Sequence, residues 1–184
     1  MRKAIIDVGT NSIRLIVADC LEQIEVCEKA IEITRIGEGM GAERLIKPQP
    51  LKRTAQAAAD FAQRARSLGA EQVRMTATSA VREALNQQAV LKALEAAAQV
   101  PLEILSGVQE AALSYAGAAQ DFRQSGQALA VLDIGGGSTE LVYETLQGLH
   151  KASVPVGAVR LKENPALAEK LSELLKPLVS SNLP

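Results

Sequence analysis

Aromatic residues are almost missing from this chain of 184 residues: tryptophan is absent, and phenylalanine and tyrosine make up 2%. This shortage argues against a platform on which the bases of single-stranded nucleic acid stack. An excess of one charge is missing too, because 20 Lys and Arg residues stand against 21 Asp and Glu residues. We therefore expect no protein held on nucleic acid by its bulk charge.

Long apolar runs and cysteines are also scarce. No apolar stretch approaches the roughly 18 residues that a membrane span needs, and no signal peptide is seen, so we expect a soluble cytoplasmic protein. Two cysteines, Cys20 and Cys27, are too few for a disulfide framework and are predicted to be buried, reduced thiols. With His150 as the one histidine, neither a zinc site nor a Ser-His-Asp set can be assembled.

What the sequence does contain is an internal repeat. Residues 4–17 read AIIDVGTNSIRLIV and residues 130–143 read AVLDIGGGSTELVY, without a gap between them when aligned. Asp7 then matches Asp133, and Ser12 matches Ser138. A repeat over so long a period indicates two related lobes and not a solenoid, whose units would be roughly 20–50 residues.

Each copy of the repeat has an apolar run, an Asp, a turn of small residues and a second apolar run. This order predicts a β-hairpin. The nucleotide-binding fingerprints of the Rossmann fold and the P-loop both need a helix directly after their glycines, so the pattern excludes them.

The rest of the chain predicts an α/β fold, a mixed sheet with helices packed on it. Further strands are expected at 22–28, 30–36, 73–78, 102–105 and 149–156, and helices at 51–68, 80–85, 87–99, 107–120 and 165–179. Ser106 and Gln109 form a capping-box pattern that begins the helix at 107–120. The polar segment 121–127 is the predicted boundary between an N-terminal lobe, 1–124, and a second lobe, 125–184.

The two turns are candidate phosphate sites. Glycine exposes consecutive backbone N–H groups to an anion, as Gly135, Gly136 and Gly137 would in the second turn. Hydroxyl and amide groups add donors there; these candidates are Thr10, Asn11, Ser12 and Ser138. The alternative is an ordinary hairpin turn, in which Gly and Asn are common.

Asp7 and Asp133 precede the turns, where a carboxylate would repel phosphate unless a divalent cation lay between them. Mg²⁺ is the natural candidate, because it binds through one or two carboxylates and substrate oxygens. Each Asp could equally cap its own turn by accepting hydrogen bonds from local N–H groups. Glu140, on the strand after the second turn, could hold the metal or a water molecule, or lie on a solvated face.

Glu110 falls in the first turn of the helix that follows Ser106. It could act as a general base that activates water, or be there because the helix dipole favours an acid. Arg82 is placed at the start of a short helix, against the dipole preference, which suggests phosphate recognition; a surface arginine is the alternative.

The chain resembles the exopolyphosphatase / guanosine pentaphosphate phosphatase family, within the actin, sugar-kinase and heat-shock ATPase superfold. The motifs that carry the resemblance are DVGTNSIRL at 7–15, TATSAVREA at 76–84, LSGVQEA at 105–111 and DIGGGSTEL at 133–141. They occur in the family's order and spacing. The resemblance implies an actin-like (ribonuclease H-like) lobe with a mixed five-stranded sheet, followed by a second lobe of the same type.

The resemblance also implies a function: a cleft between the lobes would bind polyphosphate or guanosine pentaphosphate and release a terminal phosphate. Glu110 matches the family's catalytic base, and Asp133 and Glu140 lie where Mg²⁺ would bind. Arg82, 10–12 and 135–138 match its phosphate contacts.

Two departures from the family pattern affect this expectation. Val108 and Gln109 stand where the family usually carries another acid, and the second lobe is expected to be incomplete because no further glycine turn follows Gly157. A non-catalytic phosphate- or nucleotide-binding module, or a homodimer formed through exposed sheet edge, is the alternative function.

Overall fold

The computed structural model describes residues 1–120, 122 and 129–179. The chain forms two compact units, Met1–Ile104 and Leu105–Pro184. This division comes before helix α4 (Gly107–Ala119) and therefore earlier than the predicted boundary at 124/125. The reason is that α4 packs on the sheet of the second unit. Most of the predicted boundary segment, 121–127, lies outside the described residues.

The first unit is built on a mixed five-stranded sheet in the order β3-β2-β1-β4-β5. Strands β1 to β3 form an antiparallel meander, and β4 pairs parallel with both β1 and β5. The bounds are β1 Arg2–Val8, β2 Ile13–Cys20, β3 Ile24–Glu32, α1 Pro48–Ser67, β4 Gln72–Ala77, α2 Ser79–Glu83, α3 Gln87–Ala98 and β5 Leu102–Ile104. This architecture confirms the predicted mixed sheet of five strands.

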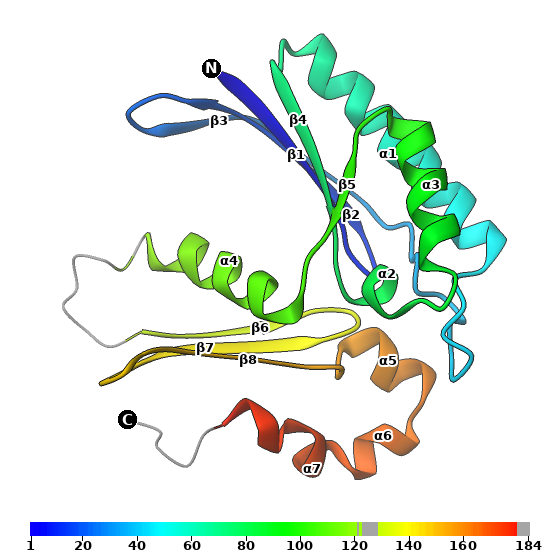
Figure 1. Cartoon of the computed structure of the whole chain (residues 1–184), viewed down its shortest axis with the longest axis vertical. Coiled ribbons are helices and arrows are strands. Elements are labelled where there is room, and N and C mark those ends of the chain that lie inside the picture. Colours follow the sequence, from blue (N-terminus) through cyan, green and yellow to red (C-terminus); the bar gives the residue numbers. More distant parts are fainter. Residues whose placement is uncertain (121, 123–128, 180–184) are drawn as a thin grey trace. The chain divides into compact units, whose positions relative to one another are not determined.

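The core of this unit lies between one face of the sheet and helices α1 and α3, which lie together on that face (Figure 1). Alternation within the strands creates the face, since Ala4, Ile6 and Val8 of β1 are buried while Lys3 and Ile5, which alternate with them, are exposed. Alanines on α1 allow the helix to approach the sheet closely.

The predicted strands 22–28 and 30–36 are wrong, because this segment forms the single strand β3. Nothing between them breaks a strand, and β3 pairs with β2 along its length with a β-bulge opposite Val17 and Ala18. The predicted burial of both cysteines is wrong too. Cys27 is exposed because β3 is an edge strand, and Cys20 is half-buried at the end of β2.

The second unit has a three-stranded antiparallel sheet in the order β6-β7-β8, with helices on both faces (Figure 1). Helix α4 covers the face that carries Asp133, and the C-terminal helices pack on the other face around Val154 and Leu178. The bounds are β6 Ala130–Ile134, β7 Thr139–Thr145, β8 Gly148–Val154, α5 Ala158–Glu163, α6 Ala166–Glu169, α7 Leu171–Leu175 and the 3₁₀ helix η1 Lys176–Leu178.

The single helix predicted for 165–179 is wrong. The segment forms the short pieces α6, α7 and η1, and helix α5 precedes them. Pro177 has no N–H group to continue a helix, which accounts for the end of α7 at Leu175 and not for the earlier break at Lys170.

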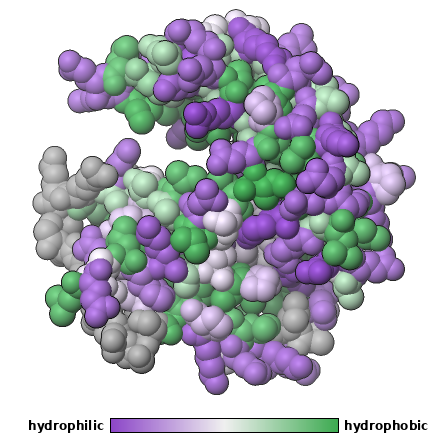
Figure 2. Space-filling view, in the orientation of Figure 1, coloured by the Kyte–Doolittle hydropathy of each residue, from purple (hydrophilic) through white to green (hydrophobic). Residues whose placement is uncertain are grey.

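On the face shown in Figure 2, hydrophilic residues predominate, and apolar side chains form separate patches between them. Ile5, Ile16 and Ile31 are exposed on the first unit, and Leu132 and Ile134 on edge strand β6 of the second. Within the described residues, no helix is both long and apolar enough to cross a membrane.

Candidate active site

Both copies of the repeat form the predicted hairpins, and their turns close in the same way. Gly9 N donates to Ser12 O at 3.0 Å, and Gly135 N donates to Ser138 O at 2.9 Å. A Cβ atom on Gly9 would stand 3.0 Å from Ser12 O, and one on Gly135 would stand 3.2 Å from Ser138 O. This close backbone approach explains why glycine opens both turns.

The first turn is anchored through its carbonyl groups. Gly37 N donates to Thr10 O at 3.1 Å, and Arg35 N donates to Asn11 O at 2.9 Å. In a trans peptide the N–H group points opposite to the C=O group, so the N–H groups of Asn11 and Ser12 face away from this loop. The hairpin thereby presents consecutive donors on one side, as an anion site requires.

The second turn is anchored in the same manner by the segment that begins α5. Ala158 N donates to Gly135 O at 3.0 Å, and Val159 N donates to Gly136 O at 2.9 Å. The N–H groups of Gly136 and Gly137 therefore face the opposite side. Ser138, which ends the turn, is 2% exposed.

Two carboxylates lie directly opposite each other beside the second turn. Asp133 on β6 pairs in register with Glu140 on β7, so both side chains are on the same face of the sheet. Ser114 of α4 donates to Asp133 Oδ2, and Ser153 donates to Glu140 Oε1 at 2.7 Å. Glu140 is only 1% exposed. Like charges in this arrangement repel each other, so a bound cation would stabilise the pair.

The corresponding place in the first unit holds opposite charges. Asp7 pairs in register with Arg14 across the hairpin, and Thr76 of β4 donates to Asp7 Oδ1 at 3.3 Å. The repeat matches Arg14 to Glu140 in the second unit. Sequence reasoning did not single out Arg14, although the gapless alignment of the repeat contained the signal.

Helix α4 begins with the predicted capping box. Ser106 Oγ accepts from Gln109 N at 3.2 Å, and Ser106 N donates to Gln109 Oε1 at 2.9 Å. Glu110 lies in the first turn of this helix, four residues before Ser114, so the two side chains share one helix face. That face meets Asp133 through the Ser114 hydroxyl.

The direction of α4 brings Glu110 toward the glycine turn. Ser114 contacts Asp133 near the turn, whereas Tyr115 donates to Glu144 further along β7, at 2.7 Å. The helix therefore runs away from the turn, and Glu110 lies one helical turn closer to it than Ser114 does. The second unit by itself thus contains Glu110, Asp133, Glu140 and the glycine turn, with Glu110 on the helix face that meets Asp133.

Arg82 lies at the turn end of the first sheet. The preceding strand β4 pairs Ala77 with Val8, directly before the first turn, and α2 follows at once. Arg82 is half-buried in the last turn of this five-residue helix, not at its start. The dipole argument that singled out Arg82 is therefore wrong, because a cation is favoured at a helix C-terminus.

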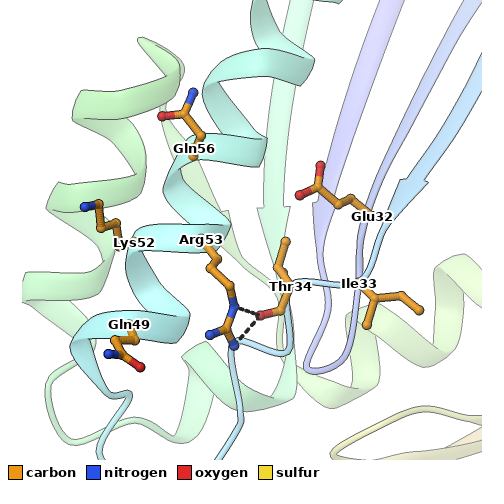
Figure 3. Close-up of a pocket in the computed structure, with 7 residues that line it drawn as sticks. All are labelled: Glu32, Ile33, Thr34, Gln49, Lys52, Arg53 and Gln56. Carbon is orange, nitrogen blue, oxygen red and sulfur yellow. Dashed lines mark hydrogen bonds between the residues drawn. The ribbon is translucent and has the colours of Figure 1, made fainter.

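A pocket of about 470 Å³ lies elsewhere on the first unit, between the end of β3 and helix α1 (Figure 3). It is lined by Glu32, Ile33, Thr34, Gln49, Lys52, Arg53 and Gln56. Arg53 Nε and Nη2 donate to Thr34 O at 3.2 and 3.1 Å (Figure 3). None of the predicted site residues lines this pocket.

The remaining polar residue noted in the sequence, His150, has a structural place. Its ring lies 4.6 Å from the ring of Tyr143, and Nε2 is 3.1 Å from Leu178 O. No group of three or more His, Cys, Asp or Glu side chains suited to a metal occurs among the described residues. A metal would thus take at most two carboxylates from one place and complete its shell from substrate and water.

Comparison with known proteins places this chain. The model of the Ppx/GppA phosphatase family matches residues 15–173. The chain belongs to this family. It is 37% identical over 173 residues to exopolyphosphatase 2 of Mycobacterium tuberculosis, an alignment that covers 88% of the chain and 54% of that relative. It is also 31% identical over 163 residues to a guanosine-5'-triphosphate,3'-diphosphate pyrophosphatase of Vibrio vulnificus, covering 88% and 33% respectively.

Solved Ppx/GppA structures show the same fold. The Aquifex aeolicus PPX-GPPA enzyme is 26% identical with a TM-score of 0.76, over 96% of this chain and 61% of that chain. An exopolyphosphatase from Cytophaga hutchinsonii, 23% identical, gives a TM-score of 0.87 over 97% and 62%. The fold is therefore actin-like, as predicted. The chain spans about half the length of the curated exopolyphosphatase that it matches.

Proposed function

We propose that this member of the Ppx/GppA family is a Mg²⁺-dependent phosphohydrolase. Its substrate is inorganic polyphosphate, from which it releases the terminal phosphate, or guanosine pentaphosphate, from which it releases the 5′ phosphate. One observation supports this proposal most directly. Helix α4 carries Glu110 on the face that contacts Asp133. Asp133 precedes the glycine turn, whose N–H groups face away from the segment that begins α5.

Asp133 and Glu140 fit a divalent cation. They are opposed in register, and each accepts a hydrogen bond from a serine hydroxyl, which leaves it acceptor capacity. Mg²⁺ commonly takes one or two protein carboxylates and fills its octahedron with phosphate oxygens and water. When bound, the metal would neutralise charge on the phosphoryl group. Asp7, which faces Arg14, is the third proposed carboxylate near the substrate.

The protein residues would perform the remaining steps. The N–H groups of 135–138 bind phosphate oxygens and stabilise the charge that develops during transfer. Glu110 accepts a proton from the attacking water. In the first unit, Thr10, Asn11, Ser12 and Arg82 bind phosphate oxygens through hydroxyl, amide and guanidinium donors.

Phosphate release from long-chain polyphosphate in the presence of Mg²⁺ tests the proposal, with Glu110→Gln as the variant. Removing the base is expected to lower the rate by about 10² to 10⁴-fold. Glu169→Gln, an exposed acid on α6 of the same unit, is the matched control and should keep the wild-type rate. Wild-type and Glu110→Gln chains that release equal phosphate would refute the proposed role of Glu110.

A homodimer remains a prediction. Edge strand β3 exposes Ile24, Val26 and Ile31, which gives a second copy apolar side chains and unpaired backbone groups to bind. Light scattering of the wild type and of Val26→Lys would test it, since a charge on this edge should leave only monomers.

A further inference from the structure

The glycine turn of the second unit rests against the segment that leads into α5. A Cβ atom on Gly157 would lie 2.5 Å from backbone atoms of Gly136 and Gly137, so only glycine fits at this position. The φ angle of Gly157 is −147°, an ordinary extended value. Close approach, and not backbone conformation, thus requires glycine here. The backbone at Gly157 is therefore in direct contact with the backbone of the glycine turn.

Three successive carbonyl groups of the turn accept hydrogen bonds from this segment. The first two, of Gly135 and Gly136, accept from backbone N–H groups of residues 158–160. The third, of Gly137, accepts from the Arg160 side chain, with Nε 2.7 Å from the oxygen. Because each peptide N–H is opposite its C=O, the bond to Gly137 O fixes the direction of the Ser138 N–H group.

We propose that Arg160 is a positioning residue, which holds the last peptide of the glycine turn so that the Ser138 N–H group points at a phosphate oxygen. Three consecutive glycines have wide conformational freedom, and without the Arg160 bond the turn would lose part of its donor geometry. The guanidinium acts through the backbone and does not itself bind the substrate. This inference rests on the proposed function, since it assumes that the turn binds phosphate.

The test compares Arg160→Gln with Lys162→Gln, which removes the same charge from an exposed position of the same helix. Inorganic tripolyphosphate with Mg²⁺ is the probe, and kcat and KM for phosphate release are measured. We expect kcat/KM of Arg160→Gln to fall about 10-fold or more, the usual effect of a residue that orients binding groups. Lys162→Gln should match the wild type, and Arg160→Lys should recover part of the loss.

Backbone amide resonances provide a second readout that does not depend on activity. Arg160→Gln should shift the resonances of Gly137 and Ser138 in the chain without ligand, while resonances of β8 stay in place. Unchanged amide resonances, or a kcat/KM equal to that of Lys162→Gln, would overturn the inference. The inference would also be overturned if Arg160→Lys restored the full wild-type kcat/KM while the amide resonances of Gly137 and Ser138 stayed in place. That result would indicate that the positive charge itself contacts the substrate. If wild type and Lys162→Gln both leave tripolyphosphate intact, the proposed function fails. The amide shifts then still test whether Arg160 positions the glycine turn.

Discussion

The two hairpins of this protein share a backbone and differ in one charge. Each has an Asp one residue before the end of its first strand and a four-residue turn closed by the same backbone hydrogen bond. Opposite that Asp stands Arg14 in the first unit and Glu140 in the second. An acid opposite a base attracts it, whereas two opposed acids repel each other and favour an added cation. One position of the repeat therefore separates a hairpin with opposite charges from a candidate metal site.

The turns also differ in what they offer an anion. The first carries side-chain donors on Thr10, Asn11 and Ser12, and two backbone hydrogen bonds anchor its carbonyls. The second has three glycines, so its donors before Ser138 are backbone N–H groups alone. It receives more anchoring, including a side-chain bond from Arg160. A turn with more conformational freedom needs more external bonds to keep one geometry.

The largest effect is expected from removing the charge that differs between the two hairpins. Glu140→Gln keeps the shape of the buried side chain but removes one of the two carboxylates. We expect Mg²⁺-dependent phosphate release to fall by about 10² to 10³-fold, since metal stabilisation of the transition state is worth several kcal/mol. Arg14→Gln, at the matched position of the first unit, should change Mg²⁺ dependence little. Mg²⁺ titrations of both variants measure this, and an equal effect of the two would contradict the assignment of the metal to the second unit.

The contacts that anchor the two turns can be compared by replacing one glycine in each anchoring segment. In Gly157→Ala the new Cβ would meet backbone atoms at 2.5 Å, while in Gly37→Ala it would meet the Thr10 Cγ2 methyl group at 2.6 Å. A backbone cannot move aside as a side chain can. We expect Gly157→Ala to destabilise the second unit by about 1–3 kcal/mol, the usual cost of overpacking, and Gly37→Ala to cost the first unit less.

Amide hydrogen exchange of each unit reports the two stabilities separately. The prediction is contradicted if Gly37→Ala loses more protection in its unit than Gly157→Ala does in the other.

The smallest expected effect concerns an ion pair of the first unit. Arg2 Nε and Nη2 donate to Asp19 at 3.0 and 2.8 Å, and this hydrogen bonding lowers the pKa of Asp19. A lowered folded pKa contributes stability above the unfolded pKa of about 3.9, which is lost as pH falls through the folded value. Asp19→Asn should therefore lower the melting temperature slightly at pH 7, and by less as the pH is lowered below the unfolded pKa. Glu22→Gln, an exposed acid in the same meander, is the control. A decrease that stays the same size as the pH is lowered would rule out the ion pair as its cause.

Local sequence signals predicted the parts of the site that depend on neighbouring residues. The strand–turn–strand pattern predicted both hairpins, and Ser106 with Gln109 predicted the start of α4. The dipole reading of Arg82 and the long C-terminal helix were wrong, because short helices have ends that periodicity does not reveal. The bonds from Ser114 to Asp133 and from Arg160 to Gly137 join segments 19 and 23 residues apart, and no local pattern announces them.

The sequence by itself determined the family, the mixed sheet and the two acid-preceded turns, because each follows from short local patterns and from their order along the chain. The tertiary structure decided that α4 packs with the second unit, which charge faces each Asp and which segment anchors each turn. Strand register and helix docking are set by packing between distant parts of the chain, so the partners of a side chain become known only when those parts are in place.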